Sequence, residues 1–195
     1  MPPKTKLSRE DIVSAALSLV EEGGENALSA RAVAGKLGVS TQPIFTHFPT
    51  MEDLKKAVIF AAADAYHARL KAEMNSGKYP PYKASGMGYI AFAGEHPGLF
   101  HLLFMRDRKQ ELPDPDGDFT DGLLPVIEKS TSLDAEAARS FHFPMWVFVH
   151  GIATMSATGY LQLDENTISE LLSAEYLAMK AHYEGLRSRN GTEKQ

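Results

Sequence analysis

Side chains that can read a base pair stand close together between Ser40 and His47. Thr41 and Gln42 occupy the start of a predicted helix of two turns that runs from Thr41 to His47. A glutamine amide can pair bidentately with adenine N6 and N7. A threonine can offer its methyl group to a thymine methyl group or its hydroxyl to a phosphate. These residue types at this position are typical of a helix that enters the DNA major groove. The alternative is that both simply occupy a solvated first turn.

The remainder of this helix and the basic residues around it offer contacts to the DNA backbone. Phe45 lacks a hydroxyl, so we expect it in the core or as an apolar wedge, and we expect Thr46 to be exposed and to contact phosphate. His47 can donate to a phosphate or form a hydrogen bond inside the domain. A basic arm precedes the first helix, and one lysine lies just beyond the motif. The candidate DNA-contacting residues are Lys4, Lys6, Arg9, Ser40, Thr41, Gln42, Phe45, Thr46, His47 and Lys55.

Two short helices and the start of a third must position these side chains. Ser29 is the expected N-cap of the first, and Gly38 is expected to end it with a positive φ. Ser40 is expected to cap the second helix. Thr50 and Asp53 have the spacing of a capping box and predict the start of a longer helix. Helix, glycine-containing turn and short polar helix together predict a helix-turn-helix.

The same stretch carries a pattern found in a known family. Its elements, in order, are Gly38-Val39-Ser40, Phe45-x-His47-Phe48 and Glu52-x-Leu54. This pattern resembles the N-terminal DNA-binding domain of the TetR family of bacterial repressors, from about Leu7 to Leu54. That family usually has Tyr at the position of Phe45 and Lys at the position of Met51, and both touch phosphate. The resemblance implies a homodimer that binds a pseudo-palindromic operator in double-stranded DNA. It also implies a small-molecule effector that shifts the connecting helix and releases the DNA.

A second group of candidate residues lies in the C-terminal part of the chain. Trp146, His150 and Gly151 resemble the Trp-x-x-x-His-Gly sequence that marks a TetR subgroup. A bulky ring and one imidazole in an apolar region predict a pocket for a largely apolar ligand with one polar group. His150 is either the polar anchor of such a pocket or a core histidine bonded to a backbone carbonyl. The candidate ligand-binding residues are Phe100, Phe104, Trp146 and His150.

Composition narrows the function classes. The chain has 195 residues, a net charge of −5 and no cysteine, which excludes disulfide bonds and thiolate metal sites. Residues 1–50 contain equal numbers of basic and acidic side chains, so the acidic surplus belongs to the rest of the chain. The histidines do not have the spacing of a metal site. Neither a nucleophile elbow nor a nucleotide-binding fingerprint is present, so we expect no metal, no cofactor and no enzyme activity.

Hydrophobic periodicity predicts an all-α protein of about nine helices. We expect a helix-turn-helix domain over residues 1–54, a helical ligand-binding and dimerisation domain over 55–189, and a polar tail over 190–195. A short helix is expected to be interrupted at Pro125. The last two long helices are expected to end near Tyr160 and Arg187. Both are apolar on more than one side, which predicts a homodimer that the substitution Leu172→Glu would dissociate.

The sequence therefore predicts a cytoplasmic transcriptional repressor that a small, largely apolar ligand releases from DNA. We find no apolar run long enough to span a bilayer and no apolar signal-peptide segment at the N-terminus. The alternative is an all-α small-molecule binding protein or enzyme that keeps this fold without binding an operator.

Overall fold

The computed structural model describes residues 7–107 and 117–192, with side chains described for 7–107 and 122–185. Within these residues the chain forms nine α-helices and no strand, which confirms the predicted all-α class. Contacts divide the chain into two compact units. We call them the helix-turn-helix unit, Met1–Tyr66 with Glu95–Lys109, and the C-terminal unit, His67–Gly94 with Gln110–Gln195. None of the described helices is both long and apolar enough to cross a membrane.

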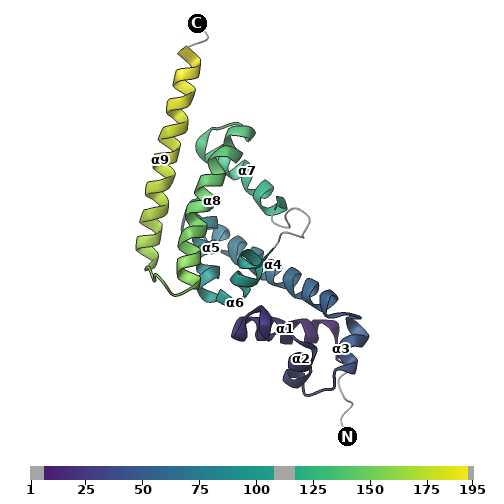
Figure 1. Cartoon of the computed structure of the whole chain (residues 1–195). Coiled ribbons are helices and arrows are strands. Elements are labelled where there is room, and N and C mark those ends of the chain that lie inside the picture. Colours follow the sequence, from purple (N-terminus) through teal and green to yellow (C-terminus); the bar gives the residue numbers. More distant parts are fainter. Residues whose placement is uncertain (1–6, 108–116, 193–195) are drawn as a thin grey trace. The chain divides into compact units, whose positions relative to one another are not determined.

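The helix-turn-helix unit contains five helical segments that Figure 1 shows in chain order, with a short 3-10 turn between the first two. They are α1 (Arg9–Gly23), α2 (Ala30–Leu37), α3 (Gln42–His47), the first part of α4 (Met51–Asn75), and α6 (Pro97–Phe100) with the π-helical turn His101–Met105 that follows it. The large side chains that are fully buried in this unit include Ile12, Val20, Val33, Ile44, Phe48, Leu54, Phe100 and Leu102.

Local capping explains most of the helix ends in this unit. The Ser29 hydroxyl accepts from the Ala32 amide, and Gly38 ends α2 in the left-handed region at φ 66°, as predicted. The amide of Asp53 donates to the Thr50 hydroxyl while the Asp53 carboxylate accepts from the Thr50 amide, which confirms the capping box. The prediction for Ser40 is wrong. The chain already turns into helical φ and ψ at Thr41, which is the N-cap of α3 and forms no side-chain cap bond.

The segment that begins at His96 packs very closely on the end of α1. A Cβ added at Gly98 would lie 2.5 Å from the Val20 carbonyl oxygen, so only glycine fits this contact. Glu21 fixes the same contact, because its carboxylate accepts from the Leu99 amide at 3.2 Å. The Glu21 carboxylate also lies 3.8 Å from Nδ1 of His96, at the start of the same segment.

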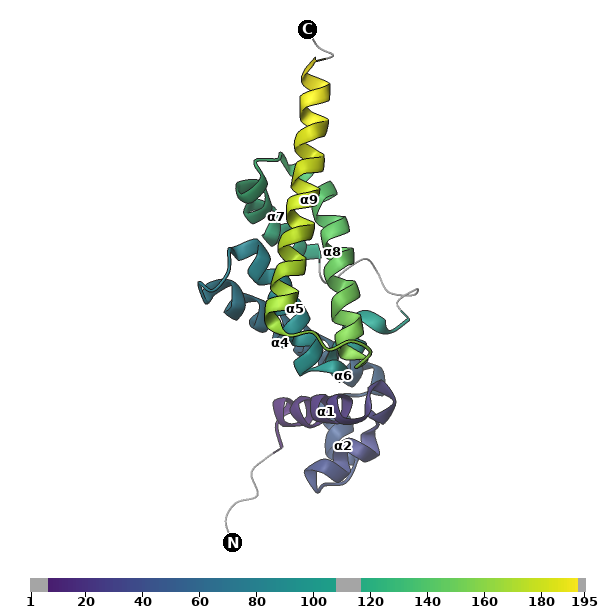
Figure 2. The same cartoon turned by 90° about the vertical axis from the view of Figure 1, so that its left-hand side faces the viewer.

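The C-terminal unit contains the rest of α4 and four further helices. They are α5 (Pro81–Glu95), α7 (Gly117–Thr131), α8 (Ala135–Ala157) and α9 (Glu165–Thr192). Figures 1 and 2 both show α8 and α9 side by side. One cluster of its core joins α7 to α8 through Leu123, Leu124, Ile127, Leu133, Ala138, Phe141 and Met145.

Three boundaries in this unit differ from the sequence prediction. Helix α7 continues through Pro125 rather than being interrupted there. Helix α8 ends at Ala157, three residues before the predicted end near Tyr160. Helix α9 begins after Asp164, whose carboxylate accepts from the Thr167 amide, and it continues to Thr192 instead of ending near Arg187. Capping and propensity locate helix starts better than helix ends, because ends fray without a fixed signal. The last residues of the predicted tail, 193–195, lie outside the described residues.

Helix α4 belongs to both units, so the two units do not coincide with the boundary at residue 54 predicted from sequence. The contact division places α4 up to Tyr66 with the helix-turn-helix, and it adds the segment around α6 to the same unit. Where the chain divides into domains that fold independently stays a prediction.

Gly98→Ala should destabilise the protein by about 1–3 kcal/mol, because the added methyl group would overlap backbone atoms of α1 that cannot move aside cheaply. Urea unfolding followed by circular dichroism measures this. Gly35→Ala is the matched control, since no atom lies within 4 Å of its added Cβ and alanine is the better helix former. A Gly98→Ala variant as stable as Gly35→Ala would contradict the close contact between α6 and α1.

Candidate nucleic-acid interface

Helix α3 has one buried side and one exposed side. Ile44 is fully buried, and Phe48, which follows the helix, is 1% exposed, so these two side chains anchor α3 to its unit. Gln42, Phe45 and Thr46 face solvent, and Phe45 is 43% exposed. Of the two roles expected for Phe45, this exposure excludes the core and leaves that of an apolar wedge. The exposed side of α3 combines one amide, one aromatic ring and one hydroxyl.

Two candidate groups on α3 are already engaged inside the protein. The Thr46 hydroxyl donates to the Gln42 carbonyl oxygen at 3.0 Å, one helical turn earlier. The Nε2 atom of His47 lies 3.1 Å from the Leu7 carbonyl oxygen, so in the tautomer protonated at Nε2 it donates there. Of the two roles foreseen for His47, this is the hydrogen bond inside the domain. Within the part of the chain that the structure describes, the side chains of Gln42 and Phe45 form no such bond, which leaves them as the exposed groups that α3 can offer to a partner.

The basic side chains around α3 differ in the contacts that they already make within the protein. The Arg9 guanidinium lies 4.6 Å from the centroid of the Phe48 ring, and Arg9 itself is exposed. Lys55 forms an ion pair with Glu25, so part of its charge is neutralised in the free protein. Arg31, which sequence reasoning did not select, is exposed in the first turn of α2. Lys4 and Lys6 lie outside the described residues.

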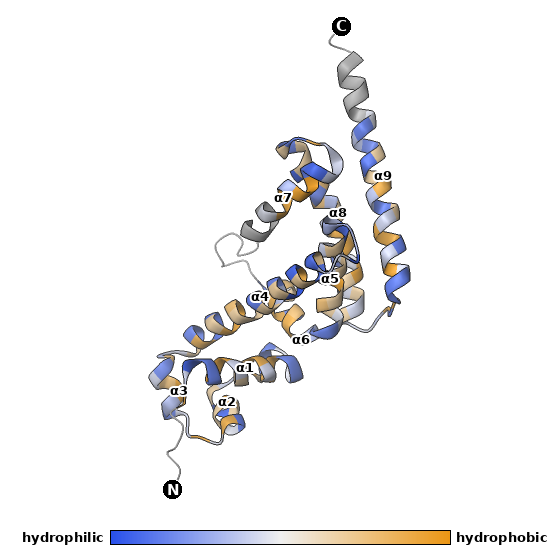
Figure 3. Ribbon diagram, turned by 180° about the vertical axis from the view of Figure 1, so that it is seen from behind, coloured by the Kyte–Doolittle hydropathy of each residue, from blue (hydrophilic) through white to orange (hydrophobic). Residues whose placement is uncertain are grey.

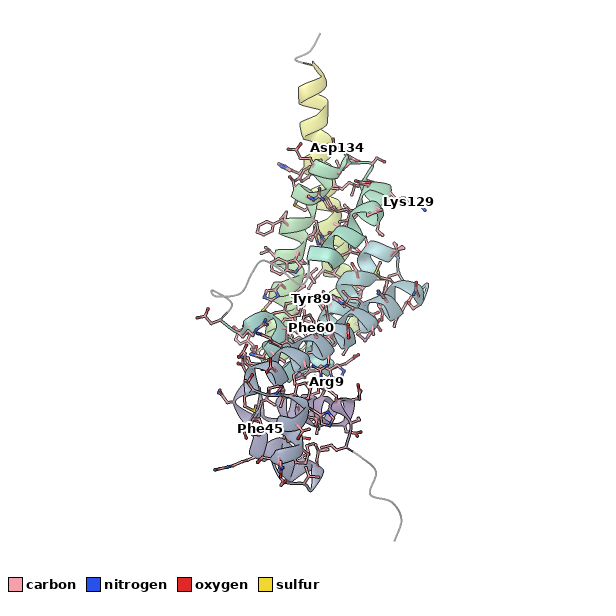
Figure 4. The ribbon with its side chains drawn as sticks, turned by 90° about the vertical axis from the view of Figure 1, so that its right-hand side faces the viewer. Arg9, Phe45, Phe60, Tyr89, Lys129 and Asp134 are labelled. Carbon is pink, nitrogen blue, oxygen red and sulfur yellow. The ribbon has the colours of Figure 1, made fainter. Side chains whose placement is uncertain are left out.

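The C-terminal unit places Trp146 and His150 together on α8. Their rings stack at 5.1 Å between centroids, and Phe143 stacks on Trp146 at 6.4 Å. The Nδ1 atom of His150 lies 2.8 Å from the hydroxyl of Tyr89 on α5, a residue that Figure 4 labels. One hydrogen bond that orients His150 is thus to a tyrosine hydroxyl. Burial lowers the pKa of His150, so the ring stays neutral near pH 7.

A second tyrosine–histidine pair joins the same two helices. The Nδ1 atom of His142 lies 2.9 Å from the Tyr82 hydroxyl, and burial lowers the pKa of His142 as well. Sequence reasoning did not find either tyrosine. The signal was present, because Tyr82 and Tyr89 lie two turns apart on one helix and the two histidines lie about two turns apart on the other. Among the described residues, no group of three His, Cys, Asp or Glu side chains is placed to hold a metal ion.

The two other candidate ligand residues fall in the helix-turn-helix unit. Phe100 is fully buried, and its ring lies 5.1 Å from that of Phe104. Phe104 in turn meets Tyr66 of α4 edge-on at 5.3 Å. These two phenylalanines therefore pack around the π-helical turn after α6, whose end carbonyls accept from the Arg106 guanidinium.

Large apolar side chains remain exposed on α8 and α9. Phe143 and Val147 of α8 are 66% and 49% exposed, and Leu177 of α9 is 63% exposed. In the coloured part of α9, hydrophobic residues recur between hydrophilic ones, as Figure 3 shows. Leu172 was the wrong residue for testing a dimer, because it is only 3% exposed and lies beside Gly86 of α5 within its own chain.

Known families match both parts of this chain. The family described as "Bacterial regulatory proteins, tetR family" matches residues 12–58, which include α2, the turn and α3. The family described as "Tetracyclin repressor-like, C-terminal domain" matches residues 82–178. The chain belongs to the TetR family. This confirms the resemblance drawn from the residues between Gly38 and Leu54 and extends it to the C-terminal unit.

Individual relatives agree with the TetR assignment. The uncharacterised HTH-type transcriptional regulator Rv0681 of Mycobacterium tuberculosis is 26% identical over 191 residues, which are 96% of this chain and 86% of that protein. A TetR-like transcriptional regulator from Rhodococcus sp. RHA1 superimposes with a TM-score of 0.67 at 18% identity, over 88% of this chain and 96% of the other. The multidrug binding protein EbrR, in complex with imidazole, has a TM-score of 0.60 at 20% identity, over 86% of this chain and 88% of its own.

This TetR-family chain is a DNA-binding transcriptional regulator and not an enzyme. Its helix-turn-helix precedes a helical C-terminal domain, as in the solved structures that share the fold.

Proposed function

We propose that this protein is a cytoplasmic homodimeric repressor that a small, largely apolar effector releases from a pseudo-palindromic operator. The observation that carries the proposal is the exposed side of α3 in a TetR-type helix-turn-helix, where Gln42 and Phe45 are free to meet a base edge. Gln42 is assigned to adenine, whose N6 and N7 match an amide bidentately. Thr41 and Ser40 precede it in the turn and are assigned to the DNA backbone or to the first base.

The basic residues are assigned to phosphates. Arg9 and Arg31 are exposed in the first turns of α1 and α2, and Lys4 and Lys6 belong to the basic arm before α1. Lys55 must break its ion pair with Glu25 before it can contact a phosphate, so it is expected to contribute less to DNA affinity than Arg9 or Arg31. His47 and Thr46 can reach phosphate only by giving up their internal hydrogen bonds. The affinity should fall steeply with salt, because each phosphate contact releases counterions.

The second copy is assigned to the apolar side of α8 and α9. Phe143, Val147 and Leu177 expose surface that water solvates poorly, and an identical surface on another chain would cover it with two-fold symmetry. A dimer is also what a pseudo-palindromic operator requires, since each half-site then meets one α3.

The effector is assigned to the neighbourhood of Trp146 and His150, with Phe100 and Phe104 as further candidates. The stacked Trp146 and His150 rings offer a flat apolar surface, and the imidazole places one polar group beside it. EbrR, a multidrug binding protein solved with imidazole, has the same fold. Release of DNA then requires that the effector bind the DNA-free conformation more tightly than the DNA-bound one.

Selection of duplexes from a randomised DNA library tests this proposal first, and Gln42→Ala tests its central contact. On the selected duplex, Gln42→Ala should lose about 1–3 kcal/mol of binding free energy and relax the preference at one position per half-site. Lys6→Ala should weaken binding to all sequences alike and lower the salt slope by about one. Fluorescence anisotropy measures both. If Gln42→Ala loses the same binding free energy on selected and on random DNA, Gln42 does not read a base.

Failure to enrich any duplex would favour a small-molecule binding protein without an operator.

Leu177→Glu should convert the dimer to monomers and abolish operator binding with it, because a buried carboxylate opposes the interface and one module buries too little surface to hold DNA alone. Sedimentation velocity measures the mass. Phe60→Glu is the control, since Phe60 is 67% exposed but belongs to α4 in the helix-turn-helix unit and not to the apolar side of α8 and α9. A Leu177→Glu variant that stays dimeric would place the interface elsewhere.

Titration with hydrophobic candidate effectors should change the emission of Trp146, the only tryptophan in the chain, in step with release of DNA. His150→Phe should weaken this response while leaving DNA affinity nearly intact. Tyr89→Phe, which removes only the hydroxyl bonded to His150, tests whether that bond orients the ring. A His150→Phe variant that no longer folds would show that His150 serves the core alone.

A further inference from the structure

We propose that the Phe45 ring reads the 5-methyl group of one thymine in each half-site of the operator. This inference rests on the proposed operator binding and adds a base contact to it. Phe45 is 43% exposed on α3, where it is the one large apolar side chain on the outer side of the helix (Figure 4). Its neighbours Ile44 and Phe48 already anchor the buried side, so the fold of the unit does not need the Phe45 ring.

The chemistry of the ring decides what it can contact. A phenyl ring has no proton to donate to a phosphate oxygen. In the major groove, the thymine methyl group is the apolar feature that a base edge presents, and phenylalanine is among the side chains that contact it. A contact to this methyl group carries sequence information, whereas a contact to phosphate does not.

The position of Phe45 predicts where this thymine lies. Phe45 follows Gln42 by three residues, so the two side chains point to the same side of α3 and are separated by ~4.5 Å along its axis. Base pairs are stacked at about 3.4 Å. The thymine should therefore lie one or two base pairs from the adenine assigned to Gln42.

The other groups on α3 do not compete for this methyl group. The hydroxyl of Thr46 forms a hydrogen bond to the Gln42 carbonyl oxygen, and this bond fixes the position of the Thr46 methyl group as well. The His47 ring is hydrogen-bonded to the Leu7 carbonyl oxygen. Both internal bonds fix their side chains in the free protein, whereas the Phe45 ring makes no hydrogen bond that must be broken.

The test uses the full-length protein and a duplex selected from a randomised library, with each thymine replaced in turn by deoxyuridine. Deoxyuridine keeps every hydrogen-bonding group and removes only the methyl group. Wild-type affinity should fall about fourfold at one position in each half-site, the factor for one buried methyl-sized group. 5-Bromouracil at that position, with a bromine of similar size, should restore the affinity.

A cycle of variants identifies the side chain responsible. Phe45→Ala should bind the thymine and deoxyuridine duplexes equally at that position, and Phe45→Leu should keep part of the difference. Phe60→Ala, which removes another exposed phenylalanine of the same unit, should keep the whole difference. Circular dichroism should show all three variants folded.

The outcomes separate this inference from the proposed function. If a duplex is enriched but no deoxyuridine position weakens wild-type binding, or if Phe45→Ala shows the same loss as the wild type, the reading of thymine by Phe45 is overturned and operator binding stands. If no duplex is enriched, operator binding fails and the Phe45 contact fails with it.

Discussion

Burial of Ile44 and Phe48 is the constraint on which the DNA-reading surface depends. Helix α3 has six residues, far fewer than an isolated helix needs to be stable in water. It persists because these two side chains bury completely against the rest of the helix-turn-helix unit. The same burial fixes its rotation about its own axis, and the remaining side chains are divided accordingly. Gln42 and Phe45 face outward because Ile44 and Phe48 face inward.

Hydrogen bonds within the unit determine which of the exposed polar groups on α3 are available to bind DNA. Thr46 and His47 each have a polar group that a DNA partner could use, yet each is bonded within the unit. Such bonds stabilise the free protein and raise the free energy needed to engage the groups elsewhere. The exposed side of α3 is consequently more apolar than its sequence suggests, and the exposed ring of Phe45 adds to that character.

The C-terminal unit solves a different problem, because α8 is apolar on both sides. Phe141 on its inner side meets Tyr82 of α5 and Tyr176 of α9, and Val149 lies beside Gly86 of α5. Two tyrosine–histidine hydrogen bonds pair polar groups between α5 and α8. Burial lowers the pKa of both histidines, so they remain neutral partners for the tyrosine hydroxyls near pH 7. The outer side retains exposed rings, and this is the surface proposed above for the second copy.

The sequence by itself determined the features that depend on near neighbours along the chain. The capping box at Thr50, the N-cap at Ser29, the left-handed Gly38, the all-α class and the helix-turn-helix follow from near-neighbour spacings, and the structure contains all of them. Only the tertiary structure decided which side of each element is covered. It exposed Phe45, buried Leu172 rather than Leu177, and brought Glu21 to the Leu99 amide 78 residues away. Periodicity shows that a helix has an apolar side, but where two sides are apolar, the packing of residues distant in sequence selects the one that is buried.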